Sequence, residues 1–201
     1  SRMFKAKEIE GELKYAVRRQ EETIYYKRLR MANPEMSRFK DLILYNLEAG
    51  EAVLTDNNDI RVYTDGKEKF RALIEEMKQA KRYIHMQYYI IRNDELWQEV
   101  EKVLIQKARE GVEVRVLFDS MGCRTMKNRD WERLEKEGIQ VAEFFPALLG
   151  QLQLRVNYRN HRKIVVIDGR VGFVGGFNVG REYLGRDKKF GYWRDTHLCI
   201  E

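Results

Sequence analysis

Residues 160–178 read NHRKIVVIDGRVGFVGGFN, in which two short apolar runs flank the dipeptide Asp168–Gly169. An Asp-Gly pair between such runs is a strong signal for a β-hairpin, because a tight hairpin turn needs positive φ angles. The stretch therefore predicts two antiparallel strands. Polar residues precede the first strand, and two glycines and an asparagine follow the second. This leaves two interpretations: a buried hairpin that contains a histidine, or a site.

Upstream of the hairpin, strand and helix patterns alternate from residue 60 onward. Residues 60–64, 83–91, 112–119 and 139–145 are rich in β-branched and aromatic side chains, which favours strands. The segments between them place apolar residues on one helical face, and Asp65 and either Asn93 or Asp94 stand where N-caps are expected. This alternation followed by a hairpin predicts an α/β fold, with a mixed central β-sheet flanked by helices.

The N-terminal segment differs in composition from the rest of the chain. Residues 1–40 contain eleven Lys or Arg and six Asp or Glu residues. We expect residues 1–50 to be a basic helical linker, either a solvated helix or a segment close to an anionic membrane surface. Residues 37–50 predict a short amphipathic helix with Phe39, Leu42, Ile43 and Leu47 on one face. The main domain is expected to span residues 51–201.

The composition limits the classes of function. The chain has 201 residues, is 43% hydrophobic and carries a net charge of +6, which suits one globular domain attracted to polyanions. It shows no apolar run long enough to span a membrane. The histidines and the two cysteines lack metal-ligand spacing, and the glycines do not match the motif of a dinucleotide-binding loop. We therefore expect no metal and no cofactor.

The residues around the hairpin suit phosphate chemistry. If the strand already begins at His161, that residue and Lys163 share a face while Asp168 has the opposite parity. A histidine beside a lysine is poor core material, because both would lose hydration. Lysine supplies positive charge for phosphoryl oxygens, and neutral imidazole can attack phosphorus or move a proton. Asn178 is placed to donate to the same oxygens, and the two glycines permit close approach of the backbone.

The pattern HxKxxxxD followed by GGxN resembles the HKD motif of the phospholipase D superfamily, here as His161, Lys163, Asp168, Gly175, Gly176 and Asn178. The surrounding text, including YIHMQYYII, AREGVEVRVLFDSMG and FGYWRDTHL, resembles bacterial cardiolipin synthases over roughly residues 60–201. That resemblance implies the N-terminal catalytic half of a phosphatidyltransferase with two HKD halves. It implies a phosphohistidine intermediate, and cardiolipin made from two phosphatidylglycerols with release of glycerol.

The resemblance also implies a role for each motif residue. His161 is the candidate nucleophile, or the acid–base partner if the two histidines exchange roles. Lys163 and Asn178 match phosphate-binding positions. Asp168 belongs to the catalytic motif but is expected to be more structural than catalytic. Asp195 matches a carboxylate that orients the catalytic imidazole, which fits the general use of a carboxylate to fix a histidine tautomer.

The implied partners are phosphatidylglycerol, the surface of the cytoplasmic membrane on its cytosolic side, and a second HKD half-domain from the same chain or a homodimer; nucleic acid is not expected. The strand pattern that runs to residue 201 suggests a piece of a longer protein. Two alternatives remain open, a single-HKD phosphodiesterase or nuclease active as a homodimer, and a non-catalytic module that binds anionic phospholipid. Two further interpretations concern the apolar residues 144–154, as core and loop or as a lip for acyl chains.

The other two histidines lack motif neighbours. His85 lies in an apolar strand pattern, which predicts a satisfied core or supporting histidine. His197 is predicted to face solvent or an interface. The basic residues near the motif also allow two readings, because residues 155–194 contain ten Lys or Arg and three Asp or Glu residues. They form either a solvated basic face or a funnel for anionic substrate.

Overall fold

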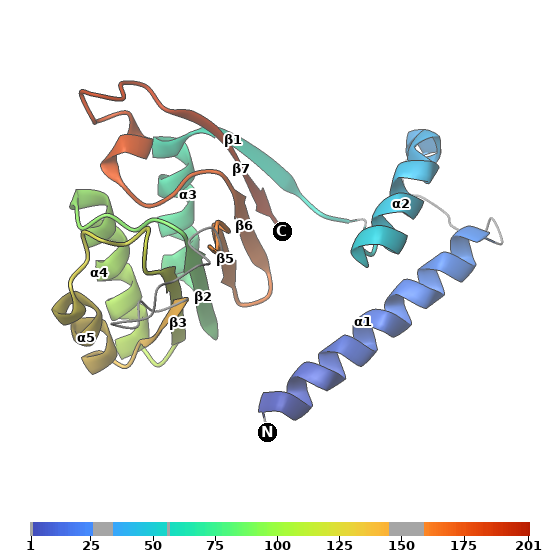
Figure 1. Cartoon of the computed structure of the whole chain (residues 1–201), viewed down its shortest axis with the longest axis horizontal. Coiled ribbons are helices and arrows are strands. Elements are labelled where there is room, and N and C mark those ends of the chain that lie inside the picture. The colour runs from blue at the N-terminus through green and yellow to red at the C-terminus, as the bar shows by residue number, and fades with distance from the viewer. Residues whose placement is uncertain (1, 26–33, 56, 145–158) are drawn as a thin grey trace, which may run out of the picture. The chain divides into compact units, whose positions relative to one another are not determined.

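The computed structural model describes residues 2–25, 34–55, 57–144 and 159–201. The chain forms two compact units, residues 1–58 and residues 59–201, each of which is described here by itself (Figure 1). The division lies eight residues after the expected end of the linker at residue 50. The membrane-proximal role of that linker stays a prediction.

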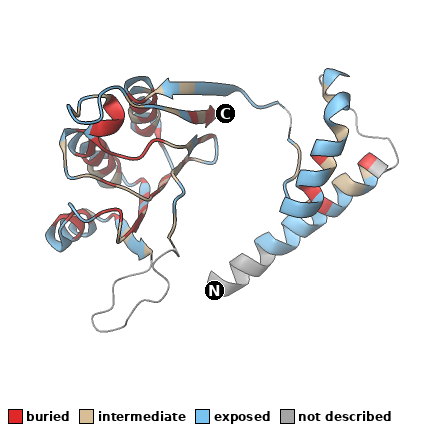
Figure 2. Cartoon of the chain, turned by 45° about the horizontal axis from the view of Figure 1, so that its top comes forward, coloured by how far each residue is buried: buried red, intermediate tan, exposed pale blue. Residues whose placement is uncertain are grey.

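The described residues of the first unit form two α-helices and a short 3-10 helix. Helix α1 spans Arg2–Tyr25, the 3-10 helix η1 spans Pro34–Phe39, and α2 spans Lys40–Gly50. Its buried core is small and lies where α1 and α2 meet (Figure 2). The expected apolar face of α2 is only half right, because Phe39 and Leu42 are exposed. Among the described residues of this unit, the buried ones are Val17, Ile24, Ile43 and Leu47.

The second unit is built on a seven-stranded sheet in the order β1-β7-β6-β5-β2-β3-β4. Strands β2, β3 and β4 pair in parallel, and the remaining neighbours pair antiparallel. The expected α/β class with a mixed sheet is therefore confirmed. The strands are β1 (Ile60–Asp65), β2 (Tyr83–Tyr88), β3 (Glu113–Asp119), β4 (Gln140–Phe144), β5 (Ile164–Ile167), β6 (Val171–Gly175) and β7 (Arg194–Ile200).

Three α-helices pack on one face of this sheet and form a single core with it. They are α3 (Gly66–Gln79), α4 (Glu95–Arg109) and α5 (Asn128–Lys136), and a 3-10 helix, η2, spans Arg181–Leu184. The N-caps are Asp65 for α3 and Asp94 for α4, whose carboxylates accept hydrogen bonds from backbone N–H groups of the first turn. Side chains in β2 alternate between this buried face and a half-exposed face.

His85 lies on the half-exposed face, so the prediction of a core histidine was wrong. Its side chain is 38% exposed, and its Nε2 lies 2.7 Å from a carboxylate oxygen of Glu113 on the neighbouring strand β3. The ring also stacks on Tyr83. The prediction of a satisfied histidine holds, because the imidazole has a hydrogen-bond partner. The strand is apolar on only one face, and residue parity puts His85 on the other.

The predicted hairpin is present, and the three residues Asp168, Gly169 and Arg170 join β5 to β6. Asp168 and Gly169 have φ angles of 57° and 70°. The Asp168 carboxylate accepts hydrogen bonds from the backbone N–H groups of Lys81, Arg82 and Tyr83, each at 2.8 Å. Burial alone would raise the pKa of Asp168, but these donors outweigh it, and the pKa lies below its usual value. Asp168 thus ties the hairpin turn to the start of β2.

Candidate active site

The candidate site lies at the end of the sheet where β2 and β3 finish and β5 begins. His161 is exposed there, and its ring stacks on the Tyr89 ring at a centroid distance of 3.8 Å. The segment that leads to His161 is held by Asp119, which is buried at the end of β3. Its carboxylate accepts a hydrogen bond from the backbone N–H of Asn160 at 3.2 Å and lies 3.9 Å from the Arg159 guanidinium.

Lys163 lies beside His161, although neither residue is within β5, which begins at Ile164. The Lys163 ammonium donates to the backbone carbonyl of His161 and sits 5.6 Å from the centre of the Tyr89 ring. Partial burial lowers the pKa of Lys163, and the negative charge of Asp195 acts in the opposite direction. The structure therefore brings the histidine, the lysine and the aspartate of WRDTH to one end of the sheet.

The two glycines of the motif make room for side chains of β7. A Cβ atom on Gly176 would lie 1.9 Å from a carboxylate oxygen of Asp195. A Cβ atom on Gly175 would lie 2.4 Å from the Cα atom and 2.7 Å from the Cγ atom of His197. Any larger residue would collide with β7 at these positions. The glycine pair therefore admits one carboxylate and one imidazole next to Lys163.

The Asp195 carboxylate is bound to its own backbone neighbour in this structure. Its Oδ1 atom accepts a hydrogen bond from the backbone N–H of Thr196 at 2.7 Å. Within the described ranges, no hydrogen bond or ion pair joins Asp195 to the His161 ring. Its negative charge acts to raise the pKa of Lys163, which associates the carboxylate with the site. The proposed orientation of the catalytic imidazole by Asp195 stays a prediction.

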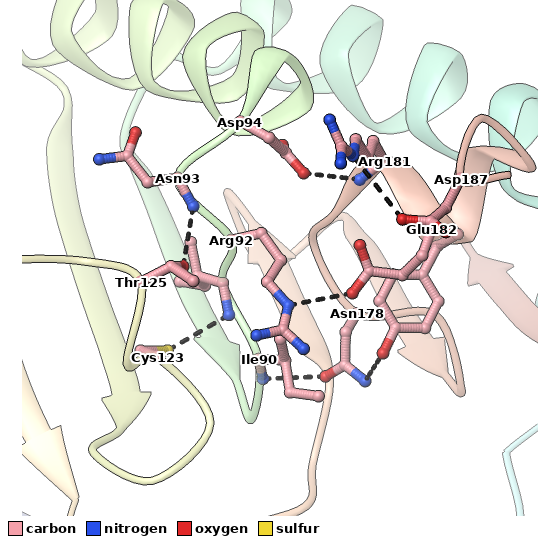
Figure 3. A network of polar contacts seen from close by, with 12 residues as sticks. Ile90, Arg92, Asn93, Asp94, Cys123, Thr125, Asn178, Arg181, Glu182 and Asp187 are labelled. Carbon is pink, nitrogen blue, oxygen red and sulfur yellow. Dashed lines mark hydrogen bonds and ion pairs between the residues drawn. The ribbon is translucent and has the colours of Figure 1, made fainter. Parts of the chain in front are cut away.

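Asn178 is buried and bridges two loops (Figure 3). Its Oδ1 atom accepts from the backbone N–H of Ile90, and its Nδ2 atom donates to the Tyr183 hydroxyl, both at 3.0 Å. The same network pairs Arg92 with Glu182 at 3.0 Å, which again joins the loop after β2 to the segment after β6. Phosphate binding by the second N–H of the Asn178 amide stays a prediction beside the structural role seen here.

Asp168 lies away from these residues. It follows the far end of β5, five residues after Lys163, which is roughly 16 Å of extended chain. The structure therefore does not bring His161, Lys163 and Asp168 together in one cluster. Asp168 holds the hairpin in place, as its three backbone hydrogen bonds show, while His161 and Lys163 form the site.

His197 was predicted to face solvent or an interface, and that prediction was wrong. The residue is 0% exposed, and its pKa falls to about 2 because of burial and the nearby charges of Lys69 and Lys163. Lys69 was missed by the sequence reasoning, and it too is 0% exposed. Its ammonium group donates to the Tyr88 hydroxyl at 2.7 Å, and burial lowers its pKa well below the usual value.

Two further findings concern the described part of the chain. No cluster of three or more His, Cys, Asp or Glu side chains is placed there to bind a metal ion. None of the helices there is long and apolar enough to cross a bilayer. The leucine-rich segment proposed as an apolar lip lies mostly in residues 145–158, outside the described residues.

Two solved structures share this α/β fold. NucT from Helicobacter pylori matches with a TM-score of 0.53 at 16% identity, over 72% of this chain and 86% of that one. The phosphatidylserine synthase of Haemophilus influenzae matches with a TM-score of 0.55 at 20% identity, over 70% of this chain and 32% of that one. At such identities the likeness concerns the fold alone.

Sequence comparison identifies the family. The family model described as "Cardiolipin synthase, PLD-like domain" matches residues 73–190, and the chain belongs to this family. A cardiolipin synthase of Oceanobacillus iheyensis is 51% identical over 83% of this chain and 35% of its own length. The major cardiolipin synthase of Bacillus subtilis is 51% identical over 81% of this chain and 34% of its own. The chain thus spans about a third of these relatives.

Proposed function

We propose that this chain is one catalytic half of a phosphatidyltransferase that makes cardiolipin from two molecules of phosphatidylglycerol. The observation that carries the proposal is the placement of an exposed imidazole, His161, beside the Lys163 ammonium at one end of the sheet. Relatives named cardiolipin synthase, about half identical to this chain, support the same reaction.

The proposed reaction has two displacements at phosphorus. A ring nitrogen of His161 attacks the phosphorus of one phosphatidylglycerol, the bond to the glycerol oxygen breaks, and glycerol leaves with a proton from an acid. A glycerol hydroxyl of the second phosphatidylglycerol then gives up its proton and attacks the phosphohistidine. The P–N bond breaks, and cardiolipin is released.

The residues around His161 have complementary tasks in this proposal. Lys163 and the second N–H of Asn178 bind the non-bridging phosphoryl oxygens, where negative charge grows in the transition state. Asp195 orients the imidazole once substrate draws the site together. Tyr89 supports the ring of His161 from one side. Since the reaction needs a second acid and base, a second HKD half, from the same chain or a homodimer, completes the site.

We further propose that the reaction takes place at the cytosolic surface of the bacterial membrane. The net charge of +6 and the basic residues 1–40 favour an anionic surface over a neutral one. Two cations of the basic residues 155–194 have carboxylate partners, since Arg170 pairs with Glu76 and Arg186 lies 4.0 Å from Glu95. The attraction of substrate is therefore expected to come from the site residues more than from a general basic face.

The experiment is to trap the intermediate on the protein that contains both HKD halves. Phosphatidylglycerol labelled with ³²P in its phosphate is added, the reaction is quenched in alkali, and labelled peptides are mapped. Label on the His161 peptide that is stable in alkali and lost in acid is the expected result. His161→Asn removes it, and Glu132→Gln, a change on the exposed face of α5, does not. Label absent from wild type, or unchanged in His161→Asn, would overturn the assignment.

A further inference from the structure

Three buried polar residues lie under the candidate site without a part in the chemistry described so far. Lys69 of α3, Tyr88 of β2 and His197 of β7, here called the buried cluster, are at most 1% exposed. The Lys69 ammonium donates to the Tyr88 hydroxyl and lies 3.7 Å from the centre of the Phe70 ring. Buried lysine and histidine side chains are rare unless they have partners, so the cluster calls for an explanation.

The imidazole of His197 is the unsatisfied member of the cluster. Neither Nδ1 nor Nε2 has a hydrogen-bond partner among the residues that the structure describes. Within that part of the chain, it is the only side chain with a buried nitrogen or oxygen acceptor that lacks a donor. Burial and the charges of Lys69 and Lys163 lower the pKa of His197 and keep the ring neutral. A neutral imidazole always offers one lone pair, so this ring is ready to accept.

The sheet register aims this acceptor at Lys163. The backbone N–H of Gly175 donates to the Lys163 carbonyl at 3.3 Å, and Gly175 pairs with His197 across β6 and β7. Lys163, Gly175 and His197 therefore form one row across three strands, whose outer Cα atoms are about 10 Å apart. No Cβ atom stands between them, and the His197 ring occupies the space over Gly175. The two side chains together are long enough to meet there.

The Lys163 ammonium has donors to spare. It has three N–H groups, and one of them goes to the carbonyl of His161 in this structure. That bond folds the lysine back on its own chain. A phosphate that draws the ammonium into the site would free this N–H group, and a nearby acceptor would then fix the new position of the side chain.

We propose that His197 is a positioning residue for Lys163: its neutral imidazole accepts a hydrogen bond from the Lys163 ammonium over Gly175 when phosphate occupies the site. The remaining N–H groups then point at the phosphoryl oxygens. The inference rests on one part of the proposed function, namely that Lys163 binds phosphate. Lys69 and Tyr88 are the other buried polar residues on this side of the sheet, and Asp195 is the carboxylate whose charge acts on Lys163.

The test follows the ammonium group directly. The chain is labelled with ¹³C and ¹⁵N in its lysines, and the Lys163 signal is assigned by its absence in Lys163→Arg. Inorganic phosphate is titrated into wild type, His197→Phe and His197→Gln. We expect phosphate to bind about tenfold more weakly to His197→Phe, because a charge-assisted hydrogen bond is lost. In the phosphate-bound state, the pKa of Lys163 is expected to be lower in this variant than in wild type. His197→Gln keeps an acceptor and is expected to restore both the phosphate affinity and the pKa of Lys163.

A control separates this role from packing in the buried cluster. Lys69→Met removes the neighbouring amine while leaving the imidazole in place, so it is expected to retain the wild-type response of Lys163. If His197→Phe folds and still binds phosphate as wild type does, with an unchanged Lys163 pKa, the proposal is wrong. If Lys69→Met weakens phosphate binding as much as His197→Phe does, the imidazole acts through packing and the proposal is also wrong.

A measurement on wild type decides the matter if His197→Phe does not fold. The ¹⁵N shifts of the His197 ring report whether a nitrogen gains a hydrogen bond when phosphate is added. A shift toward a hydrogen-bonded acceptor supports the proposal, and an unchanged ring during saturation of Lys163 overturns it. Phosphate that leaves the Lys163 signal of wild type untouched would count instead against Lys163 as a phosphate ligand, that is, against the proposed function itself.

Discussion

At the scale of single residues, the motif divides into members that face substrate and a member that holds the fold. His161 and Lys163 stand at the open end of the sheet, whereas Asp168 occupies a turn with a φ angle of 57° and receives three backbone N–H donors. Aspartate and asparagine tolerate such left-handed conformations better than most residues. Both the backbone angle and the charge explain why an aspartate stands there.

We predict that Asp168→Ala destabilises the chain by about 2–4 kcal/mol at pH 7, because three donors lose an anionic acceptor and alanine fits the positive φ poorly. Asp168→Asn keeps the conformation and one acceptor, so it is expected to cost less. Urea unfolding of both variants gives these values, with Glu132→Gln as a surface control. Equal stability of wild type and Asp168→Ala would contradict this structural role.

The same residue predicts a pH dependence. The folded state lowers the pKa of Asp168, so its contribution is present above the usual aspartate pKa of about 3.9 and disappears as pH falls through the lower folded value. The gap in stability between wild type and Asp168→Asn should therefore narrow below about pH 4. Urea unfolding from pH 7 down to pH 3 measures it, and a gap that widens on acidification would contradict the assignment.

At the scale of elements, the hairpin and the last strand are fitted to each other through glycine. β6 carries two glycines with opposite requirements, because a Cβ on Gly175 would strike the backbone of β7, whereas a Cβ on Gly172 would meet nothing within 4 Å. The two positions lie in one strand and pair with the same neighbour. They form a matched pair for testing whether close approach at the site end matters.

We predict that Gly175→Ala destabilises the chain by about 3 kcal/mol, since the added methyl lies 2.4 Å from both the His197 Cα atom and the Thr196 carbonyl oxygen. Gly172→Ala is expected to be neutral or to stabilise by up to about 1 kcal/mol, because it only restricts the unfolded chain. Urea unfolding of the two single variants measures the contrast. Comparable losses in both would show that strand propensity, and not the approach of β7, governs these positions.

The elements also show what sequence patterns can and cannot predict. The order of strands and helices, the cap at Asp65 and the tight turn at Asp168 follow from local signals, because propensity, capping and positive φ act over a few residues. Local signals do not predict which face of β7 is buried. Leu198 and Ile200 are more hydrophobic, yet His197 and Cys199 are the buried residues. The packing of α3 on the sheet and the space that Gly175 leaves for the His197 ring determine the buried face, and both come from distant parts of the chain.

At the scale of the whole molecule, the two units differ greatly in the size of their cores. In the part of the chain that the structure describes, the first unit buries four apolar side chains, whereas the second buries a continuous core between its α-helices and its sheet. Small cores contribute little net stability, so the first unit is expected to be marginal by itself. The sequence located the change in composition near residue 50 but not the structural boundary, which depends on where the sheet begins.

We predict that the two units unfold separately, the first at a lower temperature. The edge strand β1 begins at Ile60, and Asp59 exchanges two backbone hydrogen bonds with Glu201, so the sheet is complete without residues 1–58. A chain of residues 59–201 should keep the melting temperature of the main transition within about 3 °C. The helical signal that the full chain loses in its early transition should be absent from the truncated chain.

Calorimetry and circular dichroism of the full and truncated chains measure both quantities. A single shared transition, or a main transition lowered by 10 °C or more on truncation, would show that the first unit supports the sheet, because a loss that large corresponds to more than 1 kcal/mol in a domain of this size.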